Sequence, residues 1–157
     1  MRTHHYKINI HWKGNLGTGT SGYTAYSRAH QLSVDGKQDL QLSSDPAFRG
    51  DNKLYNPEEL LVASLAGCHM LWYLHLCGDA KIIVVKYDDA PEGFMEEGGP
   101  TPAKFVKVIL HPRITIKKGG DIEKAIALHH DANAKCFISN SVNFPIEHQP
   151  EIIFEEE

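Results

Sequence analysis

The alternation of apolar and polar residues at the start of the chain predicts short antiparallel strands. From Tyr6 to Trp12 every second residue is apolar, the period expected of a half-buried strand. A glycine-rich turn region follows, and a second apolar stretch spans residues 23–34. Asp35 and Gly36 then form an Asp-Gly pair, which is a hairpin signal. We therefore predict a meander of three strands before the first helix.

The most hydrophobic segment, residues 56–78, predicts a helix with a well-marked start. Asn56 can cap the first backbone amides, Pro57 suits the first helical position, and Glu59 completes a capping box. The segment is apolar on every side and approaches the length of about 20 residues that a bilayer requires. Polar and glycine residues interrupt it, however, and no second span accompanies it. We therefore expect a core helix of a soluble protein and no membrane contact.

The rest of the chain predicts an alternation of strands and a second helix. The expected elements are two strands, a helix and a final strand, at residues 81–90, 104–116, 121–136 and 151–157. Pro112 breaks the second of these strands, and residues 91–103 are expected to form an exposed loop. The order of three strands, helix, two strands, helix and strand predicts an α+β fold, with antiparallel sheet segments around a buried central helix.

Composition sets the class of protein. The chain has 157 residues, 41% of them hydrophobic and 23% charged, which suits one globular domain covering residues 1–157. A net charge of −4 gives no reason to expect nucleic-acid binding. No apolar run near the N-terminus resembles a secretory signal, so the three cysteines are expected to be reduced thiols of a cytoplasmic protein rather than a disulfide scaffold.

Cys68 lies in the middle of the predicted core helix, where a lone cysteine is most often a small buried hydrophobe. Cys77, near the helix end, has no evident partner. A reactive Cys68 would need a cation beside it, because only the thiolate is nucleophilic and the helix N-terminus is too distant to stabilise it. The helix contains neither Lys nor Arg, so Arg49 and Arg28 are the candidates.

An arginine beside an apolar helix needs a carboxylate to hold it, and Glu58 and Glu59 are the obvious suppliers. Ten residues of straight helix place Glu58 and Cys68 about 15 Å apart, with an angular offset of about 80°. One arginine cannot contact both within a straight helix. Either the helix breaks, or another subunit contributes one of the two groups. We predict the second arrangement, a site assembled across a homodimer interface.

Two segments resemble the OsmC/Ohr family, that of osmotically inducible protein C and organic hydroperoxide resistance protein. The run from Asn56 to Leu60, with Cys68 nine residues after Glu59, is similar to the helix motif of that family. The segment "HHDANAKCFISNS", residues 129–141, is similar to its later motif. Its cysteine and its Asn-Ser pair fit well, and its His-Ala part fits loosely. The strand-rich start, the central helix and the final strand also agree, so the resemblance spans most of the chain.

The resemblance implies an intertwined homodimer that reduces organic hydroperoxides with thiols. Cys68 would be the peroxidatic cysteine and Cys136 the resolving one, while Glu58 would hold the activating arginine. Ohr-type members place that arginine in the loop after the first strand, where this chain has "GNLGTGT". OsmC-type members place it before the helix, as Arg49 is placed here. Arg49 is therefore the first candidate and Arg28 the second.

The implied cycle uses no cofactor and no metal. A hydroperoxide oxidises the first thiol to a sulfenic acid, the second thiol condenses with it to a disulfide, and an external dithiol, of lipoyl type by resemblance, reduces the disulfide. Aromatic side chains near the two motifs can receive the organic part of the substrate, although each is equally explained as a core residue. They are Trp72, Phe48, Phe137 and Phe144.

Two other interpretations remain open. Ten histidines allow a zinc site. The possible ligand sets are His69, His75 and Cys77, or His129, His130 and Cys136. Neither set has a known zinc-binding spacing. The other possibility is a small-molecule-binding dimer that kept the fold without turnover. The run from Gly67 to Trp72 is unusual for both main branches, which indicates an OsmC-like subgroup with a different substrate.

Overall fold

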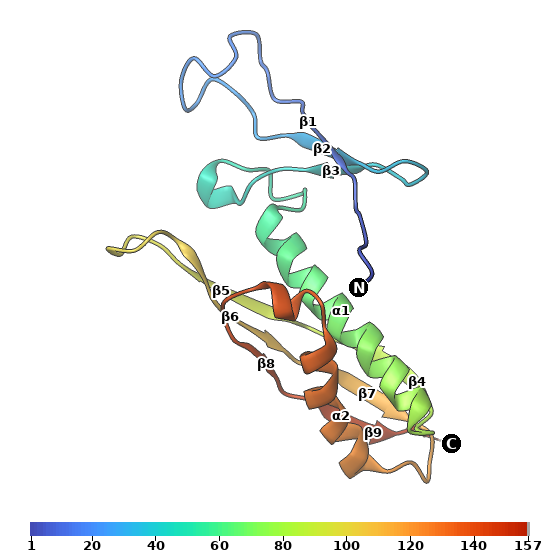
Figure 1. Cartoon of the computed structure of the whole chain (residues 1–157). Coiled ribbons are helices and arrows are strands. Elements are labelled where there is room, and N and C mark those ends of the chain that lie inside the picture. Colours follow the sequence, from blue (N-terminus) through green and yellow to red (C-terminus); the bar gives the residue numbers. More distant parts are fainter. Residues whose placement is uncertain (157) are drawn as a thin grey trace. The chain divides into compact units, whose positions relative to one another are not determined.

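The computed structural model describes residues 1–156 and divides into two compact units, Met1–Leu60 and Leu61–Glu157. The N-terminal unit contains three strands, and the C-terminal unit contains most of the long helix α1 (Pro57–Asp79), the remaining strands and helix α2 (Figure 1). Each unit has its own hydrogen-bonded sheets. The α+β class expected from the sequence is confirmed.

The N-terminal unit is the predicted meander. Strands β1 (Asn9–Trp12), β2 (His30–Ser33) and β3 (Leu40–Leu42) pair in that order, and both pairings are antiparallel. The turn between β2 and β3 contains Gly36 with a φ of 74°, a left-handed conformation that glycine adopts without strain. The Asp-Gly hairpin signal is therefore confirmed.

Helix α1 begins as the sequence predicts. The backbone N–H of Asn56 donates to Glu59 Oε2 at 3.1 Å, and the backbone N–H of Glu59 donates to Asn56 Oδ1 at 2.8 Å. These two bonds form the reciprocal capping box, which satisfies amides that have no partner within the helix. The helix then continues without interruption to Asp79.

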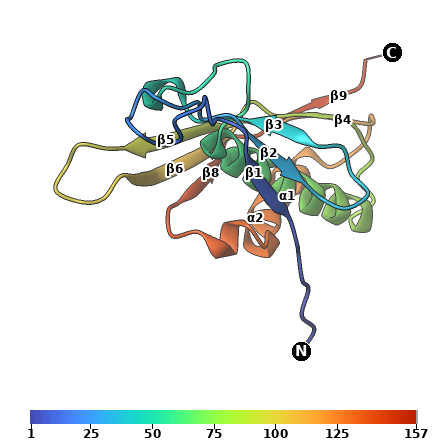
Figure 2. The same ribbon diagram turned by 90° about the horizontal axis from the view of Figure 1, so that it is seen from above.

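The C-terminal unit has two sheets of the same design. One contains β4 (Val84–Asp88), β7 (Arg113–Ile116) and β9 (Glu151–Phe154), and the other β5 (Glu92–Glu96), β6 (Lys104–Leu110) and β8 (Ile146–His148). In each sheet the central strand has one antiparallel neighbour, β4 or β5, and one parallel neighbour, β9 or β8. Helix α2 (Ile122–Lys135) lies alongside α1 in both ribbon views (Figures 1 and 2).

Three expectations about this unit need correction. Residues 91–103 are not simply a loop, because they contain β5, whose five residues are all exposed and therefore show no apolar face in the sequence. Strand β8 was not predicted, because its three residues are too few to show a period of two. Residues 104–116 form two strands in different sheets, separated at Pro112, and the parallel pairings were not predicted.

The core of the C-terminal unit has two parts that meet at one helical turn of α1. Its buried residues repeat every four positions: Leu65, His69, Tyr73 and Cys77. Leu65 packs with β6 residues in one apolar cluster, whereas Tyr73 and Cys77 pack with α2 and β7 residues in the other. His69 lies between the two clusters along this stripe.

The opposite face of α1 remains apolar and uncovered within the chain. Leu71 is 65% exposed and Leu74 is 36% exposed. By length and composition α1 could cross a membrane, but core helices of soluble proteins share this property. The sequence predicted a buried central helix, and the structure buries one face of α1.

Candidate functional site

The structure brings Cys68 and Cys136 together from two different helices. Cys68 is half-buried on α1, and Cys136 is buried at the C-terminal cap of α2. The side chains of Cys68 and Cys136 lie close enough to interact electrostatically, and all three cysteines of the chain are free thiols. The backbone N–H of Cys136 donates to Ala132 O at 3.0 Å, which fixes the second thiol at the helix end.

The two thiols differ in their surroundings. Burial is the larger cause and the interaction with the Cys68 side chain the next, and together they raise the pKa of the Cys136 thiol to about 11. The backbone N–H of Ser139 donates to Cys136 Sγ at 3.3 Å and opposes this shift. Cys136 therefore keeps its proton at neutral pH and can act as a donor toward Cys68.

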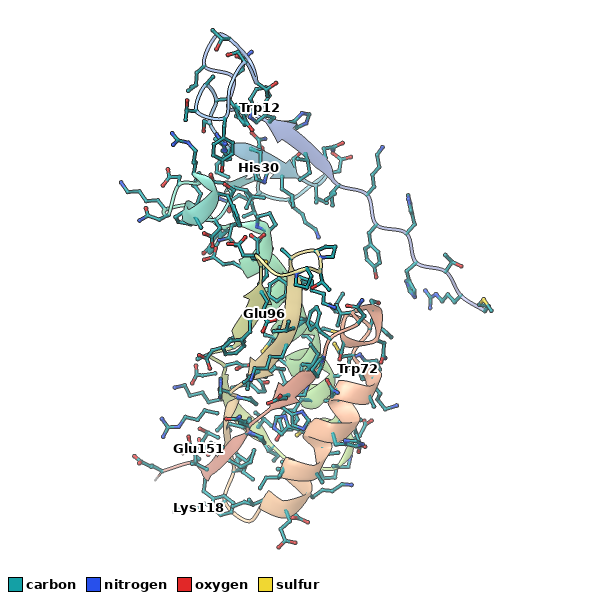
Figure 3. The ribbon with its side chains drawn as sticks, turned by 90° about the vertical axis from the view of Figure 1, so that its left-hand side faces the viewer. Trp12, His30, Trp72, Glu96, Lys118 and Glu151 are labelled. Atoms are coloured by element: carbon teal, nitrogen blue, oxygen red, sulfur yellow. The ribbon has the colours of Figure 1, made fainter. Side chains whose placement is uncertain are left out.

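An aromatic pair lies beside the thiols. Trp72 is one helical turn after Cys68, and Phe137 directly follows Cys136. Their rings meet edge to face with centroids 5.7 Å apart, and Figure 3 shows Trp72 next to the C-terminal end of α2. Lys135 Nζ lies 5.6 Å from the centre of the Trp72 ring. A cavity of about 240 Å³ adjoins this pair and is lined by Leu71, Trp72 and His75.

The other two aromatic candidates lie elsewhere. Phe144 stacks on Phe105 at 5.6 Å within an apolar cluster of the C-terminal unit. Phe48 ends a short 3₁₀ helix, Pro46–Phe48, in the N-terminal unit. The structure thus brings Trp72 and Phe137 together from the segments that carry the two thiols, whereas Phe144 belongs to the apolar cluster.

Arg28 and Arg49 both belong to the N-terminal unit, in different settings. The guanidinium of Arg28 donates to Tyr26 O at 2.7 Å and to Tyr23 O at 2.8 Å, and it lies over both tyrosine rings. Arg49 is exposed, and its side chain has no ion pair or hydrogen bond within residues 1–156. Its φ of 66° is unusual for a residue other than glycine. Arg28 is therefore held by its own loop, whereas the Arg49 side chain is available.

The carboxylate of Glu58 is half-buried and has no ion pair with an arginine in the described part of the chain. The C-terminal unit contains one arginine, Arg113, which pairs with Glu151 at 3.2 Å. A guanidinium at Cys68 would therefore have to come from an N-terminal unit. The catalytic roles of Arg49, Arg28 and Glu58 remain predictions.

Cys77 has a structural environment. It is 1% exposed, lies against the Tyr73 side chain and belongs to the larger apolar cluster. Burial raises the pKa of this thiol, which makes it a poor nucleophile. The sequence had suggested no partner for Cys77, and the structure supplies Tyr73.

Neither proposed zinc ligand set is assembled. Among residues 1–156, no group of three His, Cys, Asp or Glu side chains is arranged to hold a metal ion. His75 is exposed and lies 3.5 Å from Asp79, while Cys77 is enclosed in the apolar cluster. The two expected sets combine exposed and buried residues and so do not converge.

The structure also contains a buried histidine array that the sequence did not predict. It comprises His69 on α1 and His129 on α2, which are buried, and His148 on β8, which is half-buried. His69 Nε2 and His129 Nδ1 share a hydrogen bond of 2.9 Å, and their rings lie nearly parallel, 10° apart, with centroids separated by 5.2 Å. His148 stacks on both, and Tyr73 stacks on His129 at 3.9 Å. The four-residue spacing of Leu65, His69 and Tyr73 was the available signal.

Burial keeps these imidazoles neutral. Desolvation lowers the pKa of His69 to about 4, with a further contribution from His148. Desolvation also lowers the pKa of His129 to about 3, with contributions from the other two histidines. Each neutral imidazole has one N–H donor and one lone-pair acceptor, so one ring of the pair can donate the single hydrogen bond that the other accepts.

Comparison with known proteins identifies the class. The family model described as OsmC-like protein matches residues 50–151, which include the α1 capping motif and both cysteines of the thiol pair. The chain belongs to the OsmC-like protein family. A search of the curated proteins finds no match.

Solved structures agree on the fold. An OsmC-like protein of unknown function from Vibrio cholerae superposes with a TM-score of 0.82 at 27% identity, covering 96% of this chain and 100% of its own. An organic hydroperoxide resistance protein from Elizabethkingia anophelis gives 0.68 at 22%, with coverage of 99% and 100%. The organic hydroperoxide resistance protein OsmC of Legionella pneumophila gives 0.67 at 22%, with coverage of 96% and 98%.

The buried histidines predict acid sensitivity. The unfolded chain takes up protons below pH 6.5, whereas folded His69 stays neutral until about pH 4, so stability falls as pH drops through this window. Each such histidine contributes a slope of about 1.4 kcal/mol per pH unit, so we expect a loss of roughly 3 kcal/mol between pH 7 and pH 5. Urea unfolding at both pH values measures it.

The matched control is His75→Gln, which changes an exposed histidine of the same helix and should keep the wild-type pH dependence. His129→Phe should reduce it by about half, because one of the two rings that must remain neutral is gone. An equal urea midpoint at pH 7 and pH 5 for the wild type would contradict the assignment.

Proposed function

We propose that the protein is a thiol-dependent peroxidase that reduces organic hydroperoxides in the cytoplasm. The observation that carries this proposal is the contact between Cys68 on α1 and Cys136 on α2. Their unlike surroundings support unlike roles, with Cys68 attacking the hydroperoxide and the buried Cys136 resolving the product. Membership of a family that includes organic hydroperoxide resistance proteins supports the same reaction class.

The chemistry is balanced by the two thiols. The Cys68 thiolate attacks the outer peroxide oxygen, the O–O bond breaks, and the organic oxygen leaves as an alcohol after gaining a proton. Cys68 is then a sulfenic acid. The sulfur of Cys136 attacks that of Cys68, and the hydroxyl group of the sulfenic acid combines with the Cys136 proton and leaves as water. An external dithiol, for example one of lipoyl type, returns two electrons by thiol–disulfide exchange.

The neighbourhood of the thiols favours an organic peroxide over hydrogen peroxide. Trp72 and Phe137 form an edge-to-face pair there, and Phe137 is 69% exposed. With Leu71, they offer apolar surface to the organic group of a substrate. Burying such a group contributes about 25 cal/mol for each Å² removed from water, which hydrogen peroxide cannot gain.

A homodimer completes the proposed site. Helix α1 is unbroken, so Glu58 and Cys68 of one chain cannot contact the same arginine, and a second chain must supply one of them. The exposed apolar face of α1, with Leu71 and Leu74, would be covered in such a dimer rather than by a membrane. The proposed activator is Arg49, whose side chain is unpaired within residues 1–156 and whose backbone conformation is strained. The proposed function involves no nucleic acid.

Single substitutions test the catalytic roles. Cys68→Ser should abolish consumption of cumene hydroperoxide in the presence of a dithiol, because no thiolate remains at that position. Arg49→Ala should lower kcat/KM on the order of 100-fold by removing the cation that stabilises the thiolate, and Arg49→Lys should restore part of it. Peroxide loss is followed directly by colorimetric assay.

The matched control is Arg113→Ala, which removes an exposed ion pair with Glu151 and should leave the rate within about twofold. A Cys68→Ser variant as active as the wild type would refute the peroxidase. Wild-type protein that keeps its thiols in excess hydroperoxide would favour a small-molecule-binding dimer.

Complementation tests the shared site. We expect the Cys68→Ser and Glu58→Ala homodimers each to lose at least tenfold in activity, because each lacks one required group. Co-expressed and purified as a heterodimer through two tags, they should regain about half of the wild-type activity, since one of the two sites is intact. A heterodimer no more active than its parents would place Cys68 and Glu58 in one chain.

A further inference from the structure

The histidine array occupies a particular place relative to the thiols. His69 directly follows Cys68 on α1, and His129 precedes Cys136 by seven residues on α2. Seven residues are two helical turns, so His129 and Cys136 lie on the same face of α2. The hydrogen bond between His69 and His129 therefore joins the same two helices that carry the reacting sulfurs, with one of its partners adjacent to Cys68.

The array is enclosed and rigid. His129 is fully buried, and His69 is 1% exposed. The outer nitrogens of the pair, His69 Nδ1 and His129 Nε2, have no hydrogen-bond partner within the described residues. Burying polar nitrogens costs free energy that an apolar pair of similar size would avoid. The buried histidine pair therefore lowers the free energy of unfolding relative to an apolar pair. In return, its hydrogen bond fixes the direction and distance between the two side chains, which apolar packing does not.

That distance matters for a disulfide. Two cysteines form an unstrained bridge only when their α-carbons lie roughly 4.4–6.8 Å apart with suitably directed side chains. Apolar side chains make no directional contacts, so apolar packing alone allows one helix to shift along the other by more than this range of α-carbon distances. A hydrogen bond of 2.9 Å between two nearly parallel rings, with Tyr73 stacked on a face of His129, restricts such sliding.

We propose that the hydrogen bond between His69 and His129 is a positioning element that holds Cys68 against Cys136 and sets how readily their disulfide forms. The two histidines act through the helices and do not touch the substrate. The inference rests on the proposed function in one respect: the proposed function makes the Cys68–Cys136 disulfide a step of the catalytic cycle. The bridge itself is formed or broken with glutathione as the partner: two protein thiols and one oxidised glutathione give the protein disulfide and two reduced glutathiones.

The test is a glutathione redox titration of the full-length protein at pH 7, with the Cys68–Cys136 disulfide quantified after acid quenching. It compares two substitutions of similar size at one position. His69→Met removes the hydrogen bond, whereas His69→Gln keeps an amide where Nε2 lies. The equilibrium constant should fall at least tenfold in His69→Met and stay within about threefold of the wild type in His69→Gln, a tenfold change being about 1.4 kcal/mol.

A second pair at the partner position protects the test against a folding defect. His129→Leu removes the hydrogen bond, and His129→Asn keeps a polar atom near Nδ1. His130→Leu, at the exposed neighbouring residue, should leave the constant unchanged. Thermal unfolding followed by circular dichroism shows which variants fold, and the comparison is made at the position, His69 or His129, where both variants do. Rescue by the amide variant is a result that a merely space-filling role would not give.

Equal constants for the apolar and amide variants at a position where both fold would overturn the proposal. So would stoichiometric zinc in the purified wild type that is lost in both variants, since the histidines would then be ligands. The titration needs no hydroperoxide, so an inactive protein whose constant still follows the hydrogen bond would refute the peroxidase and leave the positioning role standing.

Discussion

The packing of α2 against α1 is the constraint on which the site depends. Neither helix carries both cysteines, and the sequence between them contains four strands, β4 to β7, and helix α2. Their contact exists because α1 buries one residue in every four against its own unit and α2 ends at Cys136. Any change that lets the two helices slide would separate the thiols while leaving both helices intact.

The same packing explains why polar groups lie in the core. The two apolar clusters of the C-terminal unit belong to two separate sheets, and His69 lies between them on the buried stripe of α1. Apolar side chains alone would join the clusters at lower cost. Neutral histidines from three elements meet there instead, which gives the junction a defined geometry at the expense of stability in acid.

The sequence predicted what depends on local signals. The α1 capping box and the Asp35–Gly36 hairpin were both read from a few adjacent residues, and the structure confirms them. Strand β5 could not be found, because all of its residues are exposed and no periodicity marks it. The parallel pairings of β8 and β9 depend on where the chain returns in space, which no local pattern encodes.

The candidate site shows the same division. Cys68 and Cys136 were selected by their resemblance to family motifs, and the structure places their side chains in contact. The histidine array was missed, because single histidines in a sequence give no sign that they meet in the core. The proposed activating role of Arg49 requires a second chain. Within residues 1–156 its side chain is unpaired, whereas Arg28 is engaged with two tyrosines.

Peptide mapping after one equivalent of an organic hydroperoxide tests the central claim most directly. The protein is oxidised under native conditions, alkylated, digested without reduction and analysed by mass spectrometry. The account predicts one crosslinked peptide pair joining Cys68 and Cys136 within a single chain, with Cys77 alkylated. A crosslink that contains Cys77, or Cys68 recovered as a sulfinic acid with Cys136 still a free thiol, would contradict it.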